Sequence, residues 1–461
     1  MKRRNIGWVL AMVALCGGCV EERLVWSPDG SMGALCNRGR LALVRPDASF
    51  LREWPWTNVV RAAWSGDGRA LVAVRAWPVA TWTDLVVRLS ADERGLIESL
   101  GNGLPELLKS VLETVDGDAS RLEKNFGQPL GMELDAHLLA AAMLFVRDKD
   151  SNGWAQITAK LHNPNPIELG SGLNVTVFEV GQAALDPVGE WQPWFRSVRP
   201  ITDVRANPRK PVVAVAQGRW LWAVAAERER GQNATLVSDR LFGTPDWSPD
   251  GRHLVYVAAV TRAAAENTIQ AGHLQATEVH WEGSGVGCGE TTAWLLGLFA
   301  FPPRIRVLPS GEVLVPTLTA TLPLPIAGPE RPQPQWYLIG MSPGSNAALR
   351  ALPAAGLPMD LREFSVSPRG RRVAVCEAGS DAVAVYDLQS QRVDLVWPKT
   401  GAQQRTLPAW RTDEELFFTV ATKLPEEPIR WMRWTPEGGV EVWSRRWPSP
   451  WLEGLLELPA R

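Results

Sequence analysis

One five-residue motif recurs along this chain and limits the folds that the chain can adopt. Trp-Ser-Pro-Asp-Gly occurs at residues 26–30 and again at 247–251, and a close copy, Trp-Ser-Gly-Asp-Gly, occurs at 64–68. Each copy joins two apolar segments, the second of which alternates in polarity as a half-buried strand does. Proline fixes φ, aspartate binds backbone N–H groups, and glycine adopts positive φ, so these residues favour a tight turn. Each copy therefore predicts a β-hairpin.

Degenerate versions of the motif extend this pattern along the chain. They share an apolar strand, a polar turn and a second apolar strand, and they lie at residues 203–216, 305–316, 363–377 and 407–420. Further strand-like segments follow most of these hairpins, and the uninterrupted spacing between turns is about 40 residues. A four-stranded unit that repeats at this spacing is typical of a β-propeller blade.

The repeat resembles that of TolB-like β-propellers, which are relatives in shape of WD-repeat proteins, over residues 22–90 and 200–447. The resemblance implies an all-β fold: a β-propeller of four-stranded antiparallel blades with an α-containing insertion. We expect seven blades, with six or eight as alternatives, and we expect strands from the two chain ends to pair and close the ring. The 23 tryptophans suit packing between such blades. TolB proteins also have an N-terminal α/β domain, for which the sequence before the first motif leaves no room.

The first residues of the chain have the pattern of a targeting signal. A positive segment, MKRR, precedes an apolar segment, and Gly18 precedes Cys19. This pattern resembles a bacterial lipoprotein signal peptide, which implies cleavage before Cys19 and lipid attachment to its sulfur. An ordinary secretory signal is the alternative. Because Val20 and not aspartate follows, we expect a lipid-anchored, periplasm-facing protein in the cell envelope, with the outer membrane favoured over the inner.

The motif spacing divides the chain into four parts. We predict a lipoprotein signal peptide at 1–18, propeller blades 1 and 2 at 19–91, an insertion at 92–200 and the remaining blades at 201–461. The insertion is expected to be helical with irregular strands or an extra blade.

Within the insertion, residues 103–115 predict an amphipathic helix that covers the propeller. Residues 137–162 predict two strands, or a helix and a strand, around the turn DKDSNG. The apolar face of the helix consists of Leu104, Leu107, Leu108, Val111, Leu112 and Val115.

Strand alternation places the elaborated segments on one face of the ring. Turns between first and second strands all lie on one face, so connections between second and third strands lie on the other. We expect the insertion to follow the outer strands of the second blade, and segments 262–275 and 322–335 to follow second strands. Elaborated loops on a rigid scaffold often carry function. The face opposite the motif turns is therefore predicted to bind a protein partner.

The turn DKDSNG matches the first half of a calcium-binding loop. Asp148, Asp150, Asn152 and Gln156 would supply oxygen ligands at alternating positions. An EF-hand is excluded, because Ala159 stands where its last glutamate is required. Calcium is thus the one candidate cofactor, and a plain polar turn is the alternative.

A serine hydrolase motif is present but lacks its partners. The segment Gly-Met-Ser-Pro-Gly at 340–344 fits the pattern of a nucleophile elbow around Ser342. That reaction needs an aspartate and then a histidine after the serine, and all five histidines precede it. We interpret 340–344 as a turn between a third and a fourth strand, and we predict that the protein is not an enzyme.

The charge balance and the cysteine content narrow the classes of partner and the number of disulfides that the chain can have. The chain has 48 basic and 50 acidic residues without a long run of one sign, which argues against nucleic acid as a partner. Besides Cys16 and Cys19, the cysteines are Cys36, Cys288 and Cys376, which we interpret as buried core residues that form at most one disulfide.

We therefore expect a non-catalytic, lipid-anchored binding or scaffolding propeller of the bacterial cell envelope. Its partner would be an envelope protein, and its contact with the membrane would be the lipid anchor. The alternatives are a propeller enzyme, a hydrolase or lyase, and a glycan-binding module that uses the central channel. The sequence leaves open whether a small molecule or glycan binds.

Overall fold

The structure is a computed structural model that describes most of the chain between residues 24 and 451. The described residues are 24–37, 39–114, 136–160, 175–185, 189–226, 234–260, 270–282, 285–299, 302–317, 335–340, 349–352, 359–377, 382–398, 408–420, 430–444, 447 and 451. They belong to two compact units. The helical unit lies within Ala76–Val180 and Phe195–Pro200, and the propeller unit within Cys16–Arg75, Gly181–Trp194 and Ile201–Arg461.

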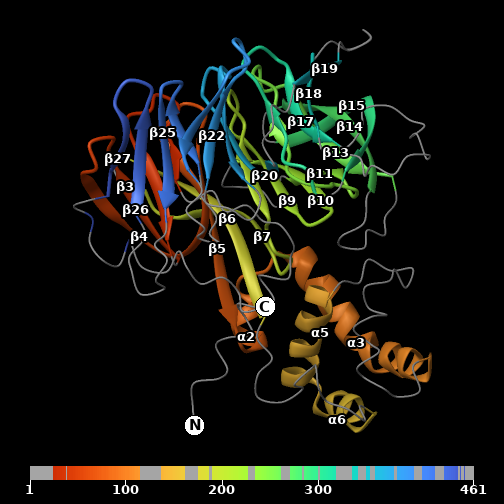
Figure 1. Cartoon of the computed structure of the whole chain (residues 1–461). Coiled ribbons are helices and arrows are strands. Elements are labelled where there is room, and N and C mark those ends of the chain that lie inside the picture. The colour runs from red at the N-terminus through yellow and green to blue at the C-terminus, as the bar shows by residue number, and fades with distance from the viewer. Residues whose placement is uncertain are drawn as a thin grey trace. The chain divides into compact units, whose positions relative to one another are not determined.

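The described strands form one seven-stranded sheet and five four-stranded sheets, each in chain order (Figure 1). The seven-stranded sheet contains β1 (Leu24–Trp26), β2 (Gly33–Asn37), β3 (Gly39–Val44), β4 (Phe50–Trp64), β5 (Ala70–Val79), β6 (Val175–Ala184) and β7 (Gln192–Ser197). The next two sheets contain β8 (Asp203–Ala206), β9 (Val212–Gln217), β10 (Trp220–Ala225) and β11 (Ala234–Ser238), then β12 (Asp246–Trp247), β13 (His253–Ala259), β14 (Gln270–Glu282) and β15 (Gly285–Phe299).

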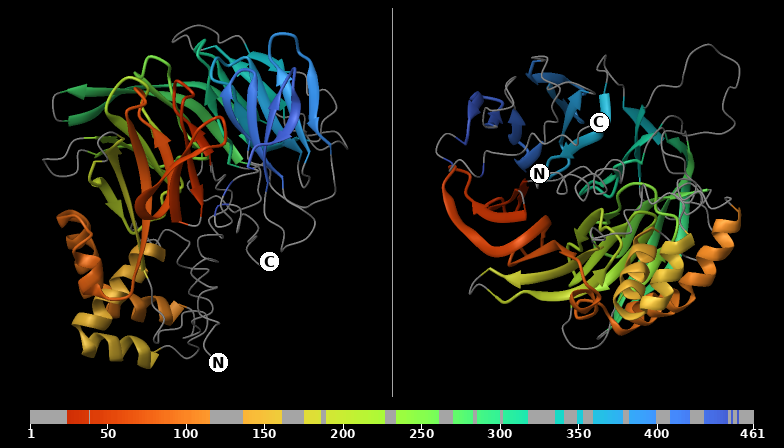
Figure 2. Two further views of the ribbon diagram at one scale, coloured as in Figure 1. Left: turned by 90° about the vertical axis from the view of Figure 1, so that its left-hand side faces the viewer. Right: turned by 90° about the horizontal axis from the view of Figure 1, so that it is seen from below.

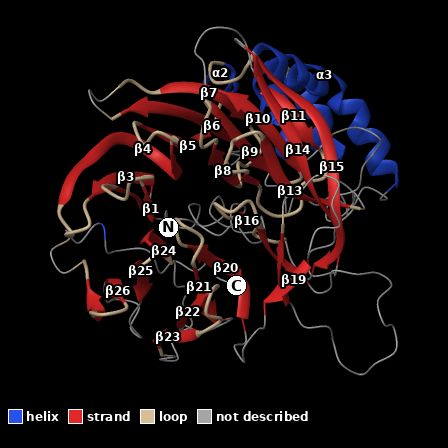
Figure 3. Cartoon of the chain, turned by 90° about the horizontal axis from the view of Figure 1, so that it is seen from above, coloured by secondary structure: helices blue, strands red, loops and turns tan. Residues whose placement is uncertain are grey.

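Three more four-stranded sheets complete the described strands. They contain β16 (Arg306–Val307), β17 (Val313–Thr317), β18 (Gln335–Ile339) and β19 (Leu349–Leu352); β20 (Met359–Val366), β21 (Arg372–Glu377), β22 (Val383–Asp387) and β23 (Val393–Trp397); and β24 (Ala409–Thr412), β25 (Glu415–Val420), β26 (Arg430–Thr435) and β27 (Gly439–Val442). Within the propeller unit, β1, β8, β16, β20 and β24 lie around a common centre (Figure 3). The predicted β-propeller of four-stranded antiparallel blades is confirmed.

Strand β4 takes part in two blades. Its first part pairs with β3 from Phe50 to Val59, and its second part pairs with β5 from Val59 to Trp64. Asn58, where the two parts meet, has a φ of 62°. We interpret β4 as the outer strand of one blade and the innermost strand of the next. On that interpretation the described strands would fill seven blades, and the number of blades stays a prediction.

The three close copies of the motif form the same hydrogen-bonded turn. In the first copy, the Ser27 hydroxyl donates to Asp29 Oδ1 at 2.6 Å, and the Gly30 N–H donates to the Ser27 carbonyl at 2.8 Å. Ser65 and Asp67 repeat the first contact at 2.6 Å, as do Ser248 and Asp250. The hydrogen bond from the Ser27 hydroxyl is the main reason that the pKa of Asp29 lies below its usual value. The polar residues of the motif therefore bind one another.

The tryptophan of the motif joins successive blades. The indole N–H of Trp64 donates to the carbonyl of Val25 at 2.9 Å, and that of Trp247 donates to the carbonyl of Arg205 at 2.9 Å. The Trp410 indole N–H makes the same bond to the carbonyl of Ser365 at 3.0 Å. Each acceptor lies on the innermost strand of the preceding blade. At these three positions the tryptophan gives its one polar group a partner while its rings pack between sheets. The indole N–H of Trp26, in the first copy, has no hydrogen-bond partner among the described residues.

Neighbouring turns also contact one another, which explains the altered second copy of the motif. The Asn207 side-chain amide donates to the Gly251 carbonyl at 2.8 Å. At Gly66, which replaces the proline of the other copies, a Cβ atom would lie 2.3 Å from the Pro208 carbonyl oxygen. No side chain fits there, so glycine is required by the turn of the next blade.

Aromatic side chains connect the two ends of the described chain. The expected pairing of strands from both ends is not found among the described strands, because β1 and β24 belong to different sheets. Instead, the indole N–H of Trp443 donates to the Pro46 carbonyl at 2.8 Å, and that of Trp447 donates to the Ala48 carbonyl at 3.0 Å. The buried cluster around them contains Leu24, Leu35, Ala42, Val44, Ala409, Phe417, Trp431, Trp443, Trp447 and Trp451. We call it the terminal aromatic cluster.

The helical unit has a core of its own. Its helices are α2 (Trp82–Val86), α3 (Ala91–Thr114), α5 (Ala136–Lys149) and α6 (Ser151–Lys160), and α3 lies beside α5 (Figure 2). The prediction of two strands, or a helix and a strand, for residues 137–162 is wrong, because α5 and α6 occupy 136–160. No helix in the described part of the chain is long and apolar enough to span a membrane.

The apolar face of α3 packs within the helical unit. Leu104 and Leu108 are buried in a cluster with residues of α5, α6 and β6. A Cβ atom on Gly101 would lie 2.2 Å from the Phe145 ring, so the two helices approach closely there. The expectation that this face covers the propeller is therefore wrong. Of the other predicted face residues, Leu107 packs against the same core, and the side chains of Val111, Leu112 and Val115 lie outside the described residues.

The helical segment connects a second strand to a third. It leaves the seven-stranded sheet after β5 and returns at β6, so the expectation that it follows the outer strands of the second blade is wrong. Segments 262–275 and 322–335 also join second to third strands, as expected, although only 270–275 and 335 among their residues are described. These connections leave from the strand ends opposite the motif turns.

Candidate functional site

Charged residues occupy one repeated position on the innermost strands of three successive blades. The position precedes the motif tryptophan or its equivalent, and in the other blades it holds valine, alanine or serine. In chain order the residues there are Val25, Ala63, Arg205, Asp246, Arg306, Ser365 and Ala409. Because small residues suffice for the fold at four of these positions, the charges at the other three need another explanation.

The charged side chains are close together and largely buried. Arg205 Nε lies 2.8 Å from Asp203 Oδ2. Asp246 accepts the Val307 N–H at 2.9 Å through Oδ2 and the Trp247 N–H at 3.0 Å through Oδ1. These bonds compensate the carboxylates for the water that they lose.

Arg306, which lies on β16, completes the group. Burial, and then the charge of Arg205, lowers the pKa of Arg306 to about 10, while Asp246 and Asp203 act in the opposite direction. Arg306 therefore stays charged at neutral pH. We call Asp203, Arg205, Asp246 and Arg306 the inner-strand charge cluster; Figure 3 shows β8 and β16 near the centre.

Sequence reasoning missed this cluster, although a signal was present. The motif aligns the inner strands, and the residue before the tryptophan changes from small to charged in only some blades. Maintaining several charges in a protein interior is costly unless they pair with one another or with a ligand. The cluster can therefore serve as a polar site at the centre of the propeller unit.

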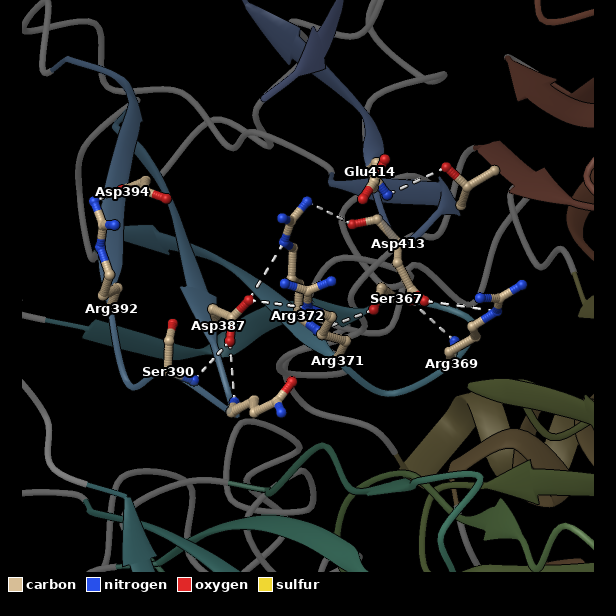
Figure 4. A network of polar contacts seen from close by, with 12 residues as sticks. Ser367, Arg369, Arg371, Arg372, Asp387, Ser390, Arg392, Asp394, Asp413 and Glu414 are labelled. Carbon is tan, nitrogen blue, oxygen red and sulfur yellow. Dashed lines mark hydrogen bonds and ion pairs between the residues drawn. The ribbon is translucent and has the colours of Figure 1, made fainter. Parts of the chain in front are cut away.

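Charged residues at the turns of the last two sheets have structural partners (Figure 4). The Arg369 N–H donates to Asp413 Oδ1 at 3.1 Å, and the Arg372 guanidinium donates to the Asp413 carbonyl at 2.9 Å. Arg371 Nε donates to Asp387 Oδ2 at 3.2 Å, and Asp387 Oδ1 also accepts backbone N–H groups of its own turn. These contacts join β20–β23 to β24–β27, so this network supports the blades.

The residues of the predicted calcium loop lie between and on two helices. Asp148 Oδ2 accepts the Trp82 N–H at 2.7 Å, and Asp150 Oδ1 accepts the Gly153 N–H at 2.9 Å at the beginning of α6. Asn152 and Gln156 lie on α6 itself. Within the described ranges, no group of three or more histidine, cysteine, aspartate or glutamate side chains is arranged for a metal. The calcium site stays a prediction.

Calorimetry tests that prediction directly. Because Asp148 and Asp150 already accept backbone N–H groups, we expect titration of the purified protein with calcium chloride to give no saturable heat. Asp148→Ala should give the same trace as the wild type. Saturable heat that is present in the wild type and lost in Asp148→Ala would establish the calcium site.

The other predicted residues divide between the described and undescribed parts. Cys19 and Ser342 lie outside the described residues. Gly340 follows β18, and β18 and β19 are the third and fourth strands of their sheet, as expected for that turn. Cys36 and Cys376 are buried, whereas Cys288 is exposed, so its assignment to the core is wrong.

Comparisons with solved structures find β-propeller domains among the similar proteins. No protein-family model matches the chain, and no curated protein matches it. The β-propeller domain of Cps50 (Swd1) from Myceliophteria thermophila is similar over 86% of this chain and 93% of that chain, with 9% identity and a TM-score of 0.46. TolB from Acinetobacter baumannii is similar over 57% of this chain and 58% of that chain, with 16% identity and a TM-score of 0.35.

A third similar structure is the β-propeller domain of the Trilobed protease from Pyrococcus furiosus. The similarity covers 89% of this chain and 93% of that chain, with 9% identity and a TM-score of 0.43. The propeller assignment of this chain rests on its own described sheets.

Proposed function

We propose that this protein is a non-catalytic, lipid-anchored binding or scaffolding propeller of the bacterial cell envelope. Its protein partner binds the face opposite the motif turns. The observation that carries this proposal is a difference between the motif turns and the connections from second to third strands. The motif turns bind one another and the next blade, as at Asn207 and Gly251. The connections between second and third strands carry the long segments, among them the helical unit.

A second candidate function is a propeller enzyme or a glycan-binding module. The inner-strand charge cluster favours it, because arginine and aspartate side chains supply the donors and acceptors that polar ligands require. The scaffold proposal has the broader support, since it uses the elaborated connections of several sheets.

Two positions at opposite ends of β13 test the proposed face. Val260 follows β13 at the connection to β14 and is 42% exposed, and Arg252 precedes β13 in the motif turn with an exposed side chain. A photo-crosslinking amino acid is placed at each position in the full-length protein in cells. We expect a crosslinked envelope protein from position 260 and none from position 252, because the two sites lie at opposite ends of one strand.

The contrary results are equally clear. Crosslinks from position 252 alone would place the partner on the turn face, and the absence of crosslinks from both positions would contradict the proposal of a protein partner.

The lipid anchor is tested with a substitution at the predicted attachment site. Cys19→Ala should abolish the incorporation of radiolabelled fatty acid into the protein, and a variant that still incorporates the label would contradict lipidation at Cys19.

A further inference from the structure

The helical unit contains a buried carboxylate with three polar contacts. Glu179 on β6 is 4% exposed. Its Oε2 accepts the Trp77 indole N–H at 2.9 Å. Its Oε1 lies 3.3 Å from Arg196 Nε and 3.7 Å from the guanidinium nitrogen Nη1 of Arg88. Trp77 lies on β5 and Arg196 on β7, while Arg88 lies between α2 and α3. Four separate segments therefore meet at one carboxylate.

Two arginines at one carboxylate leave a positive charge. The side chains of Arg88 and Arg196 keep 32% and 33% of their surface exposed, so solutes can reach both. The Arg88 guanidinium lies 4.4 Å from the centre of the Trp77 ring. A guanidinium over an aromatic face is attracted to the ring and still presents its N–H donors in its own plane. Such a planar set of donors fits the paired oxygens of an oxyanion.

A second acid, Glu93, lies close to Arg196. Its Oε1 accepts the Val198 N–H at 3.2 Å. Its Oε2 is buried and has no hydrogen-bond partner among the described residues. Burial raises the pKa of Glu93 to about 7, against the lowering effects of the Val198 N–H, Ser197, Arg199 and Arg196. Near neutral pH, part of the protein therefore holds this carboxyl uncharged, which increases the positive charge around Arg196.

We propose that Arg88 and Arg196 form a binding site for an oxyanion, a carboxylate or a tetrahedral group such as sulfate or phosphate, next to Glu179. Glu179 and Trp77 position the arginines, and Glu93 sets how strongly the site attracts the anion. An ionised Glu93 repels the anion, whereas a protonated Glu93 does not. The test of this site does not depend on a protein partner.

The charge arrangement favours a ligand over a purely structural role. A structural ion pair needs one cation for one buried carboxylate, whereas two arginines lie beside Glu179 and the second acid, Glu93, is partly uncharged near neutral pH. The oxygen of Glu93 without a partner adds a desolvation cost. An anion held between Arg88 and Arg196 compensates the second guanidinium.

Isothermal titration calorimetry with two simple anions tests the site. Full-length purified protein in chloride buffer is titrated with sodium sulfate and, separately, with sodium acetate, at pH 6 and pH 8. Neither anion changes charge in this range. We expect saturable binding that is about threefold tighter at pH 6, the size of the interaction between unit charges about 6 Å apart in water. Tighter sulfate binding indicates a phosphate-like ligand, and tighter acetate binding indicates a carboxylate.

Variants separate the ligand role from a structural one. Arg88→Met keeps the apolar stem and should weaken binding at least about tenfold, the effect of losing one charged hydrogen-bonding partner. Lys109→Met removes an exposed charge from α3 and should leave binding unchanged. Glu93→Gln keeps an oxygen for the Val198 N–H but cannot ionise, so its affinity should be the same at pH 6 and pH 8.

Circular dichroism establishes that each variant is folded. If Arg88→Met does not fold, the wild type at two pH values and Glu93→Gln still decide the question. Absence of saturable binding by both anions to the wild type at pH 6 would overturn the proposal. The same conclusion follows if Glu93→Gln keeps the pH dependence of the wild type, or if a folded Arg88→Met binds as tightly as the wild type.

Discussion

Replacing Gly66 with alanine is expected to lower the free energy of unfolding by about 3 kcal/mol, the upper part of the range for overpacking a well-packed site. The added Cβ would lie 2.3 Å from the Pro208 carbonyl oxygen and 2.5 Å from its carbonyl carbon. Those atoms are backbone, so no side-chain rotation relieves the contact, and the two neighbouring turns must separate. Urea unfolding followed by circular dichroism measures the change.

The matched control uses the same position in another copy of the motif. Pro249 in the third close copy corresponds to Gly66, and Pro249→Gly removes atoms without creating a contact. Its cost should be less than about 1 kcal/mol and arise mainly from the greater freedom of the unfolded chain. Equal costs for Gly66→Ala and Pro249→Gly would mean that the contact between turns does not determine the glycine.

Replacing Trp443 with alanine is expected to lower the free energy of unfolding by about 4 kcal/mol, as for a large buried aromatic side chain. Trp443 is 5% exposed, and its ring centre lies 4.4 Å from that of Phe417 and 4.7 Å from that of Trp447. The substitution also leaves the Pro46 carbonyl without the indole donor. Because this cluster connects the first and last sheets, the loss should separate them.

Two controls divide this effect into its parts. Trp443→Phe keeps a ring in the cluster but cannot donate to Pro46, so it should cost about half as much as Trp443→Ala. Leu395→Ala removes a side chain that is 61% exposed and should change stability by less than about 0.5 kcal/mol. A cost below 1 kcal/mol for Trp443→Ala would show that the terminal aromatic cluster does not hold the ends together.

The repeat was predictable because its chemistry is local. Ser27, Asp29 and Gly30 bind one another within five residues, so the same letters produce the same turn wherever they occur. The spacing of such turns then predicts the number of strands between them. The need for glycine at position 66 could not be predicted in this way. It arises from the contact with Pro208, which lies more than a hundred residues away in the sequence.

The helix expected at 103–115 falls on α3, but α5, α6 and the charged sites were not predicted, for different reasons. Residues 137–162 contain apolar runs that fit either a strand or a buried helix, and the alanines of α5 were the signal for a helix. Glu179 contacts Trp77, which lies 102 residues before it, and Arg88 from another distant segment, so no short sequence pattern indicates these contacts. The inner-strand charge cluster could have been found by aligning the motif, since Arg205, Asp246 and Arg306 occupy one repeated position.

The placement of the helical segment between β5 and β6 has a consequence for the order of folding. About 95 residues separate these neighbouring strands, and closing so long a loop costs roughly 2.5 kcal/mol more than closing a five-residue hairpin loop. The core of the helical unit contains Val79 from the end of β5 and Val175 from the start of β6. Once that core has formed, the two strands start side by side. The segment that interrupts the repeat therefore reduces the entropy that its own blade must lose when the blade assembles.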